Sequence, residues 1–131
     1  MNTKLNQILA EISAGELLDK ITILEIKREK ITDSEKLKDI NKELSSLTKT
    51  SDEKIPDKKK IEDLVSNLKK INLKLWDIEE NKRKAEKEKK FDETFIQLSR
   101  DVYKSNDERA KIKLKINEIL GSNIKEVKSH Y

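Results

Sequence analysis

The chain has 131 residues, of which 43% are charged and 34% hydrophobic, and it contains two glycines, one proline and no cysteine. This composition excludes a disulfide framework and a thiolate metal site, and it disfavours a turn-rich all-β fold. The length predicts a single helical domain over residues 1–131, and the high charge content favours thin helical layers over a deep sheet core. We therefore predict an all-α fold.

The formal net charge of +4 is a weak indication of a nucleic-acid partner. Acidic and basic residues are interleaved along most of the chain, as they are on solvated helix faces. Only residues 82–90 are locally basic, with six Lys or Arg against two Glu. A nucleic-acid-binding helical hairpin built on this segment is a hypothesis, but the sequence favours other partners.

The sequence also lacks the features of membrane and metal proteins. No run approaches the 18 apolar residues of a membrane span, and the first residues lack the apolar core of a signal peptide. We therefore expect a cytoplasmic protein without a membrane span. One histidine and no cysteine predict that no metal is bound, and we expect no cofactor.

The N-terminal residues 4–12 are compatible with two local structures. Leu5, Ile8, Leu9 and Ile12 have helical spacing, whereas alternation from Ile8 to Ile12 is typical of a short extended segment. The first helix that the sequence predicts clearly follows directly, over residues 14–31.

The predicted helix 14–31 begins at a capping box, in which Ser13 and Glu16 satisfy each other's free backbone N–H groups. Its apolar residues lie on two nearly opposite faces, so we expect it to be buried on two sides, as a central helix would be. One face holds Leu17, Ile21 and Leu24, and the other holds Ile23 and Ile26.

A second capping box, from Thr32 to Glu35, predicts a helix over residues 35–47. Residues 48–57 are polar, lack periodicity and contain the only proline, so we predict a mobile loop there.

The longest predicted helix covers about residues 58–89. Its apolar residues alternate at spacings of three and four, which is typical of a helical seam: Ile61, Leu64, Leu68, Ile71, Leu75 and Ile78. Such a helix is longer than a compact domain of this size is wide, so shorter helices or a second copy of the chain must cover it. The sequence thus predicts an antiparallel helical bundle built on this helix, and a homodimer.

The last predicted helix covers residues 93–120, with Asp92 as N-cap and Gly121 just after its end. Ser105 to Glu108 form another capping box, so the helix is either continuous or broken at 105.

Several polar side chains fall on helix faces that should point inward, where unpaired charges are costly. They could line a pocket that holds a carboxylate or phosphate through Arg and Lys, or they could form structural ion pairs; we favour ion pairs. For Arg109 we predict an inward position and a partner acid on another helix, with Glu79 or Glu25 as first choice. The ligand-binding candidates are Arg28, Glu25, Trp76, Glu79, Arg83, Tyr103, Asn106, Arg109 and Lys113.

Five sequence blocks together resemble a family of short bacterial all-α proteins classed only as a domain of unknown function. The blocks are GELLDKITILEIK (15–27), LWDIEE (75–80), FDETFIQL (91–98), VYKSNDERA (102–110) and GSNIKEVKSHY (121–131). The resemblance implies an association with glycosyltransferase and cell-envelope polysaccharide genes, and it brings no catalytic residue with it. Within these blocks lie inward polar residues, among them Asp19 and Asp77. A fainter analogy of architecture exists with the all-α chorismate mutases, which bind a dicarboxylate among Arg and Lys side chains.

Two classes of function remain foremost. The absence of a nucleophile motif, a phosphate loop and metal-ligand spacing favours a non-catalytic protein-interaction or structural module that acts as a homodimer. The alternative is a small all-α enzyme or binding protein with an anionic ligand in an Arg/Lys-lined pocket, with a role in cell-envelope polysaccharide metabolism.

Overall fold

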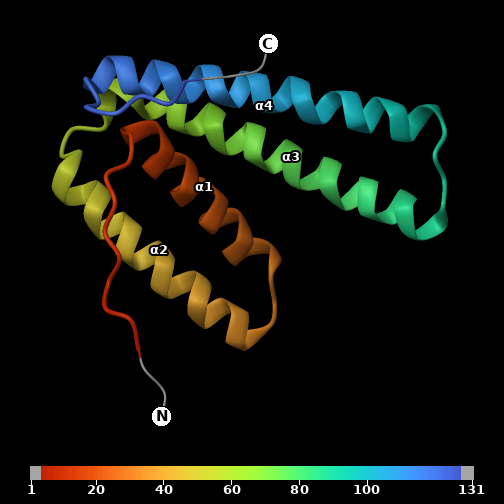
Figure 1. Ribbon diagram of the computed structural model, residues 1–131, viewed down its shortest axis with the longest axis horizontal. Helices are drawn as coiled ribbons and strands as arrows, with labels where there is room; N and C mark the ends of the chain where they lie inside the picture. The colour runs from red at the N-terminus through yellow and green to blue at the C-terminus, as the bar shows by residue number, and fades with distance from the viewer. Residues whose placement is uncertain (1–3, 128–131) are drawn as a thin grey trace.

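The computed structural model describes residues 4–127, and four α-helices account for most of them (Figure 1). A short 3-10 turn, η1 (Lys59–Ile61), leads into the third helix, and no strand occurs between residues 4 and 127. The all-α prediction is therefore confirmed. The helices are α1 (Ala14–Lys30), α2 (Ser34–Lys54), α3 (Glu62–Glu88) and α4 (Glu93–Leu120).

The helices form two antiparallel hairpins, α1–α2 and α3–α4 (Figure 1). The far end of the α3–α4 hairpin, where the two helices are connected, projects beyond α1 and α2. Within the described residues no helix is both long and apolar enough to cross a membrane.

Helix α1 packs against each of the other three helices, as its two apolar faces predict. Leu24 packs with Ile40 and Leu44 of α2. The main core lies toward the other helices, where Leu17 and Leu18 meet side chains of α3, α4 and the α2–α3 connection: Ile55, Ile61, Leu68 and Ile116. Because α1 lies between α2 and the α3–α4 hairpin, a polar side chain on the side that faces this hairpin must find a partner on α3 or α4.

Three predicted helix boundaries are confirmed by their capping geometry. The Ser13 hydroxyl accepts a hydrogen bond from the backbone N–H of Glu16 at 3.1 Å, and Asp92 accepts one from Phe95 at 3.2 Å. Gly121 has φ of 64° at the end of α4, in the left-handed region that glycine adopts without strain. The second predicted capping box does not form, because the N-cap of α2 is Asp33 and its side chain makes no capping hydrogen bond.

The predicted loop over residues 48–57 is wrong for most of its length, since α2 continues to Lys54. The apolar stripe of α2 contains Ile40, Leu44 and Leu47, and Ser51 stands one turn further along it, where another aliphatic residue would be expected; Ser51 is buried. The stripe then leads to Ile55, which is part of the core. A small polar residue in the stripe concealed the helical periodicity in the sequence.

Two further alternatives are decided by the structure. Helix α4 is continuous through Ser105, which is buried inside it, so a capping box there does not interrupt the helix. Residues 4–12 form neither helix nor strand, and every one of them is exposed. We call this segment the N-terminal arm.

Candidate functional site

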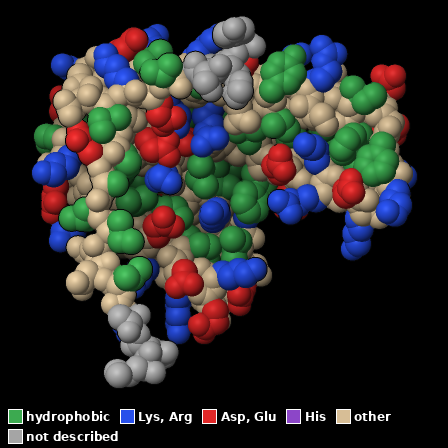
Figure 2. Space-filling model, viewed as in Figure 1, with side chains coloured by type: hydrophobic (Ala, Val, Ile, Leu, Met, Phe, Trp, Pro, Cys, Tyr) green, Lys and Arg blue, Asp and Glu red, His purple; other side chains and the backbone are tan. Residues whose placement is uncertain are grey.

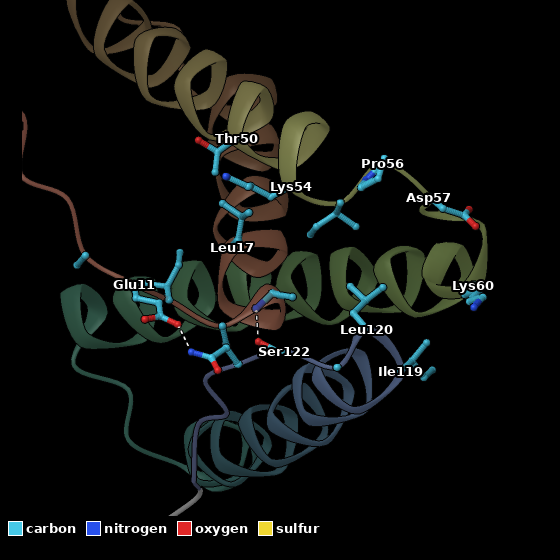
Figure 3. A pocket seen from close by; sticks show the side chains of 17 residues that line it. Glu11, Leu17, Thr50, Lys54, Pro56, Asp57, Lys60, Ile119, Leu120 and Ser122 are labelled. Carbon is cyan, nitrogen blue, oxygen red and sulfur yellow. Dashed lines mark hydrogen bonds between the residues drawn. The ribbon is translucent and has the colours of Figure 1, made fainter.

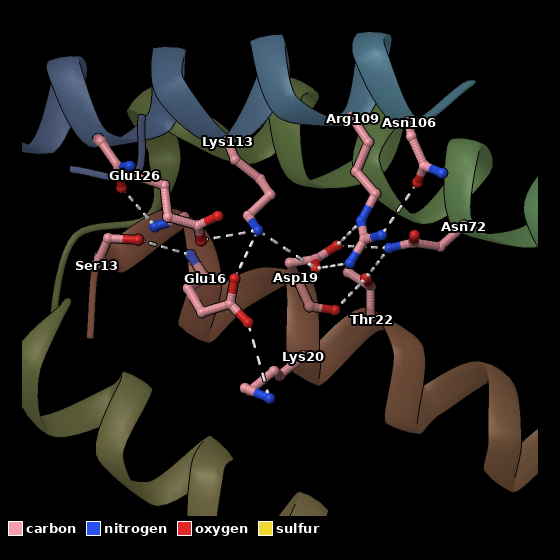
Figure 4. Close-up of polar contacts among 12 residues, drawn as sticks. Ser13, Glu16, Asp19, Lys20, Thr22, Asn72, Asn106, Arg109, Lys113 and Glu126 are labelled. Atoms are coloured by element: carbon pink, nitrogen blue, oxygen red, sulfur yellow. Dashed lines mark hydrogen bonds and ion pairs between the residues drawn. The ribbon is translucent and has the colours of Figure 1, made fainter. Parts of the chain in front are cut away.

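The side chain of Asp19 is the centre of a polar cluster between α1, α3 and α4 (Figure 4). Its carboxylate is 1% exposed and receives two hydrogen bonds from Arg109, from Nε to Oδ1 at 3.0 Å and from Nη2 to Oδ2. Asn72 Nδ2 donates to Asp19 Oδ1 at 2.8 Å and to Thr22 Oγ1 at 2.9 Å. One carboxylate thus connects three helices, in the fork-to-carboxylate geometry that arginine makes and lysine does not.

Lys113 joins this cluster to the C-terminal segment. Its ammonium lies 2.5 Å from Glu16 Oε2, 3.0 Å from Glu126 Oε1 and 3.8 Å from Asp19 Oδ2. Glu16 Oε1 also lies 3.7 Å from the Nζ atom of Lys20, on the next turn of α1. Figure 4 shows Lys113 reaching from α4 between the acids of α1 and Glu126. Lys113, which lies on α4, therefore connects the first turn of α1 with the C-terminal segment that follows α4.

The pKa values of Glu16, Arg109 and Lys113 are shifted toward the charged forms. Hydrogen bonding to Glu126 and to Lys113 lowers the pKa of Glu16 to about 2, against burial, which raises it. The hydrogen bond to Asp19 raises the pKa of Arg109. Burial lowers the pKa of Lys113, but its hydrogen bonds to Glu16 and Glu126 outweigh that effect and raise it.

The formal charges within the cluster cancel. Its three acids, Glu16, Asp19 and Glu126, face three cations, Lys20, Arg109 and Lys113. A bound anion would have to displace one of these carboxylates from its cation. The arrangement is therefore suited to holding helices together, and it leaves little positive charge for a ligand.

A close approach of α1 to α4 fixes the position of Lys113. The backbone N–H of Gly15 donates to Asn117 Oδ1 at 2.6 Å, and a Cβ atom on Gly15 would lie 2.6 Å from the Lys113 carbonyl oxygen. Such a contact is too short for any side chain, so α4 can pack here only because residue 15 is glycine.

A groove of about 440 Å³ opens beside the polar cluster, between α1, α3 and α4. Ile23, Ile26 and Leu75 give it an apolar wall. Four of the nine sequence-predicted ligand residues also line it: Trp76, Glu79, Arg83 and Arg109. We call this the Trp76 groove.

The other five candidates lie elsewhere. Arg28 lines a separate cavity against α2, Glu25 lies 4.0 Å from Lys69, and Tyr103 is 54% exposed. Asn106 Oδ1 accepts a hydrogen bond from Arg109 Nη1 at 3.4 Å, and Lys113 belongs to the ion-pair cluster. The structure therefore does not bring Arg28, Arg83 and Arg109 to one cavity.

The prediction that Arg109 pairs with an acid of another helix is confirmed, but the predicted partner is wrong. Arg109 is paired with an acid of another helix, but that acid is Asp19 and neither Glu79 nor Glu25. Glu25 faces Lys69 of α3, and Glu79 lies on the rim of the Trp76 groove.

Sequence reasoning also missed Glu16, Thr22 and Glu126 as members of the cluster; it placed Asn72 on the core side of the long helix but did not count it among the ligand-binding candidates. A signal for its α1 members is present in the spacing, because Gly15, Asp19, Thr22 and Ile26 follow one another at intervals of four, three and four. That stripe lies on the second buried side of α1, so an acid within it requires a buried partner.

The described residues contain no group of three or more His, Cys, Asp or Glu side chains that could hold a metal ion. Neither the comparison with curated proteins nor the comparison with solved structures gives a match. A family model matches residues 8–131, nearly the whole chain, and the fold and motif blocks described above lie within that range. The chain belongs to the family of unknown function DUF6165.

Proposed function

We propose that this protein is a helical interaction module that acts as a homodimer. The observation that carries the proposal is the N-terminal arm, in which Leu5, Ile8 and Leu9 are each more than 80% exposed. Three large aliphatic side chains within five residues are costly to leave in water, and such exposure is typical of a segment that binds another protein.

The surface of the helical body offers a second apolar region. Figure 2 shows hydrophobic side chains gathered in the hollow between the two helical hairpins. The Trp76 groove lies between α1 and the α3–α4 hairpin, and tryptophan is among the residues most often found at the centre of protein interfaces.

The polar cluster supports the interaction module over the anion-binding protein. Arg109 and Lys113, the two inward cations of α4, already have carboxylate partners within the chain. Their chemistry is then that of helix-to-helix ion pairs, which define how the two hairpins are packed.

Analytical ultracentrifugation of the full chain tests the proposal. At tens of micromolar we expect a dimer, and we expect the triple variant Leu5→Ser/Ile8→Ser/Leu9→Ser to be a folded monomer. The variant chain should still fold because these three side chains are exposed and contribute little to the core.

The matched control is Asn6→Ser/Gln7→Ser, which changes polar residues of the same arm and should leave the dimer intact. A monomeric wild-type chain would refute the homodimer. If the triple variant is still a dimer, the interface does not involve the N-terminal arm.

A further inference from the structure

The N-terminal arm has no regular secondary structure, but its aliphatic residues have the spacing of a helix. Leu5, Ile8, Leu9 and Ile12 stand at positions i, i+3, i+4 and i+7, the pattern with which an amphipathic helix binds in an apolar groove. In an extended chain, Ile8 would point to the opposite side from Leu5 and Leu9. Only a helical arm therefore presents Leu5, Ile8 and Leu9 to one surface.

The base of the arm is held against the helical body. It lies at the N-terminus of α1, beside a cavity of about 730 Å³ (Figure 3). Glu11 accepts a hydrogen bond from Asn123, and Ile12 stands on the wall of this cavity and is 41% exposed. The part of the arm that is available to bind another surface is therefore the segment 4–10.

The Trp76 groove is a surface of the kind that accepts such a helix. Its apolar wall comes from two helices, α1 and α3, and Ile23, Leu75 and Trp76 are only partly buried. Figure 2 shows the hollow between the hairpins in which hydrophobic side chains gather. A helix that lays its apolar face into a groove between two helices removes both apolar surfaces from water.

The charges of the groove favour an occupant with little net charge. Two acids and one arginine stand on its rim, and the other arginine of the groove, Arg109, is paired with Asp19. Residues 4–12 carry one lysine and one glutamate, so their formal charges cancel. The match between arm and groove is therefore one of apolar surfaces.

The arm cannot place all three aliphatic side chains in the groove of its own chain. The groove begins at Ile23, ten residues after Ser13, which is about 15 Å along α1. A helix over residues 5–12 is only about 12 Å long, and its C-terminal end is attached to Ser13. Ile8 and Leu9 would lie closer still to Ser13 and short of the groove. The groove of a second copy is not subject to this restriction.

We propose that the arm folds into an amphipathic helix when it binds, and that it binds in the Trp76 groove of a second copy of the chain. Each copy then contributes one arm and receives the other, an exchange that two-fold symmetry closes. The exchange covers both apolar surfaces at once, whereas a different partner would have to cover each of them separately. The inference rests on the homodimer proposed above and names the surface that the arm contacts in it.

Cysteine cross-linking tests the contact, because the chain has no cysteine of its own. With oxidised glutathione present, we expect a chain that carries Ile8→Cys to form a disulfide with a second chain that carries Glu79→Cys, on the exposed rim of the groove. Gln7→Cys is the matched control, because residue 7 lies on the far side of the arm helix, and it should form little disulfide with Glu79→Cys. Lys60→Cys, on the cavity at the base of the arm, should form little disulfide with Ile8→Cys.

Substitutions at Ala10 test whether the bound arm is helical. Ala10 is exposed and lies off the aliphatic face of the arm helix, so its replacement leaves the contacts of that face unchanged. Ala10→Pro removes a helical hydrogen bond and should weaken dimerisation about a hundredfold, and Ala10→Gly should weaken it about fivefold. Sedimentation measures both effects. The Cα chemical shifts of residues 5–10 should move to helical values as the protein concentration is raised and the dimer forms.

Two results would overturn the inference and leave the homodimer intact. One is a dimer in which Ile8→Cys joins Lys60→Cys and not Glu79→Cys, which would place the arm in the cavity at the α1 N-terminus. The other is a dimer whose arm keeps coil chemical shifts and tolerates Ala10→Pro, which would mean that the arm binds in an extended form. A wild-type chain that stays monomeric at tens of micromolar would refute the homodimer and this inference together.

Discussion

Arg109 and Asp19 are joined by a two-pronged ion pair, although they are ninety residues apart in the sequence and lie on different hairpins. The Asp19 side chain is 1% exposed and that of Arg109 27%. A buried carboxylate that loses its cation is left with a large desolvation penalty, so removing one partner is more destabilising than replacing both by apolar residues. This pair is one of the polar links between α1 and α4, beside the Lys113–Glu16 ion pair.

The first prediction concerns that link. Arg109→Ala should lower the free energy of unfolding by about 3–5 kcal/mol, because it leaves the Asp19 carboxylate buried with only Asn72 and a more distant Lys113 as partners. Urea unfolding at pH 7 measures this loss. Arg109→Lys is the matched control: it keeps the charge without the fork, and should lose less than Arg109→Ala. An Arg109→Ala variant as stable as the wild type would show that the ion pair contributes nothing.

The second prediction concerns Asn72, whose amide donates to both Asp19 and Thr22. Asn72→Ala should cost about 1–3 kcal/mol, since it removes the donor to Thr22 Oγ1 and one of the two donors to Asp19 Oδ1, both of which are buried. Asn72→Asp should cost more at pH 7, because it puts a second carboxylate next to that of Asp19. Thermal unfolding of both variants should show their difference narrowing as the pH is lowered and the new carboxylate is protonated. Equal stabilities at pH 7 would contradict the assigned direction of the Asn72 hydrogen bonds.

The fold could be predicted from the sequence wherever the local signal and the tertiary structure agree. Ser13, Asp92 and Gly121 mark helix ends by short-range chemistry alone, and the structure confirms all three. The end of α2 could not be predicted in this way, because Ser51 is buried by its position in the stripe and not by its own hydrophobicity.

In the candidate site, too, some features follow from the local sequence and others depend on tertiary packing. The inward position of Arg109 follows from the pattern of α4, but its partner depends on how α1 is rotated between α3 and α4. Asp19 and Glu25 both lie on α1, and the rotation of this helix turns Glu25 toward Lys69 and Asp19 toward Arg109. That rotation is determined by packing, including the absence of a side chain at Gly15.

The third prediction tests that close approach. Gly15→Ala should lower the free energy of unfolding by about 1–3 kcal/mol, because the new Cβ atom would press on the backbone carbonyl of Lys113, which cannot swing away as a side chain could. Gly121→Asn is the matched control, since that site has open space and asparagine tolerates the left-handed conformation. The control should change stability by much less. If Gly15→Ala unfolds like the wild type in denaturant titrations, α1 and α4 are not in contact at this point.

The last prediction concerns acid. The folded-state pKa of Glu16 is lowered from 4.5 to about 2, first through hydrogen bonding to Glu126 and then through Lys113. A carboxyl group whose pKa is lower in the folded state than in the unfolded state adds stability above its unfolded pKa, and that stability is lost as the pH falls toward the folded value. Between pH 4.5 and about 2 the unfolded chain binds a proton at Glu16 that the folded chain does not.

The wild type should therefore lose more stability over this range than Glu16→Gln, which cannot bind that proton. Unfolding free energies of both proteins at pH 7, 4.5 and 3 measure the difference. Glu35→Gln, at an exposed pair with Lys38, serves as control and should follow the wild type. Parallel pH profiles for the wild type and Glu16→Gln would mean that Lys113 and Glu126 do not hold the Glu16 carboxylate in its charged form.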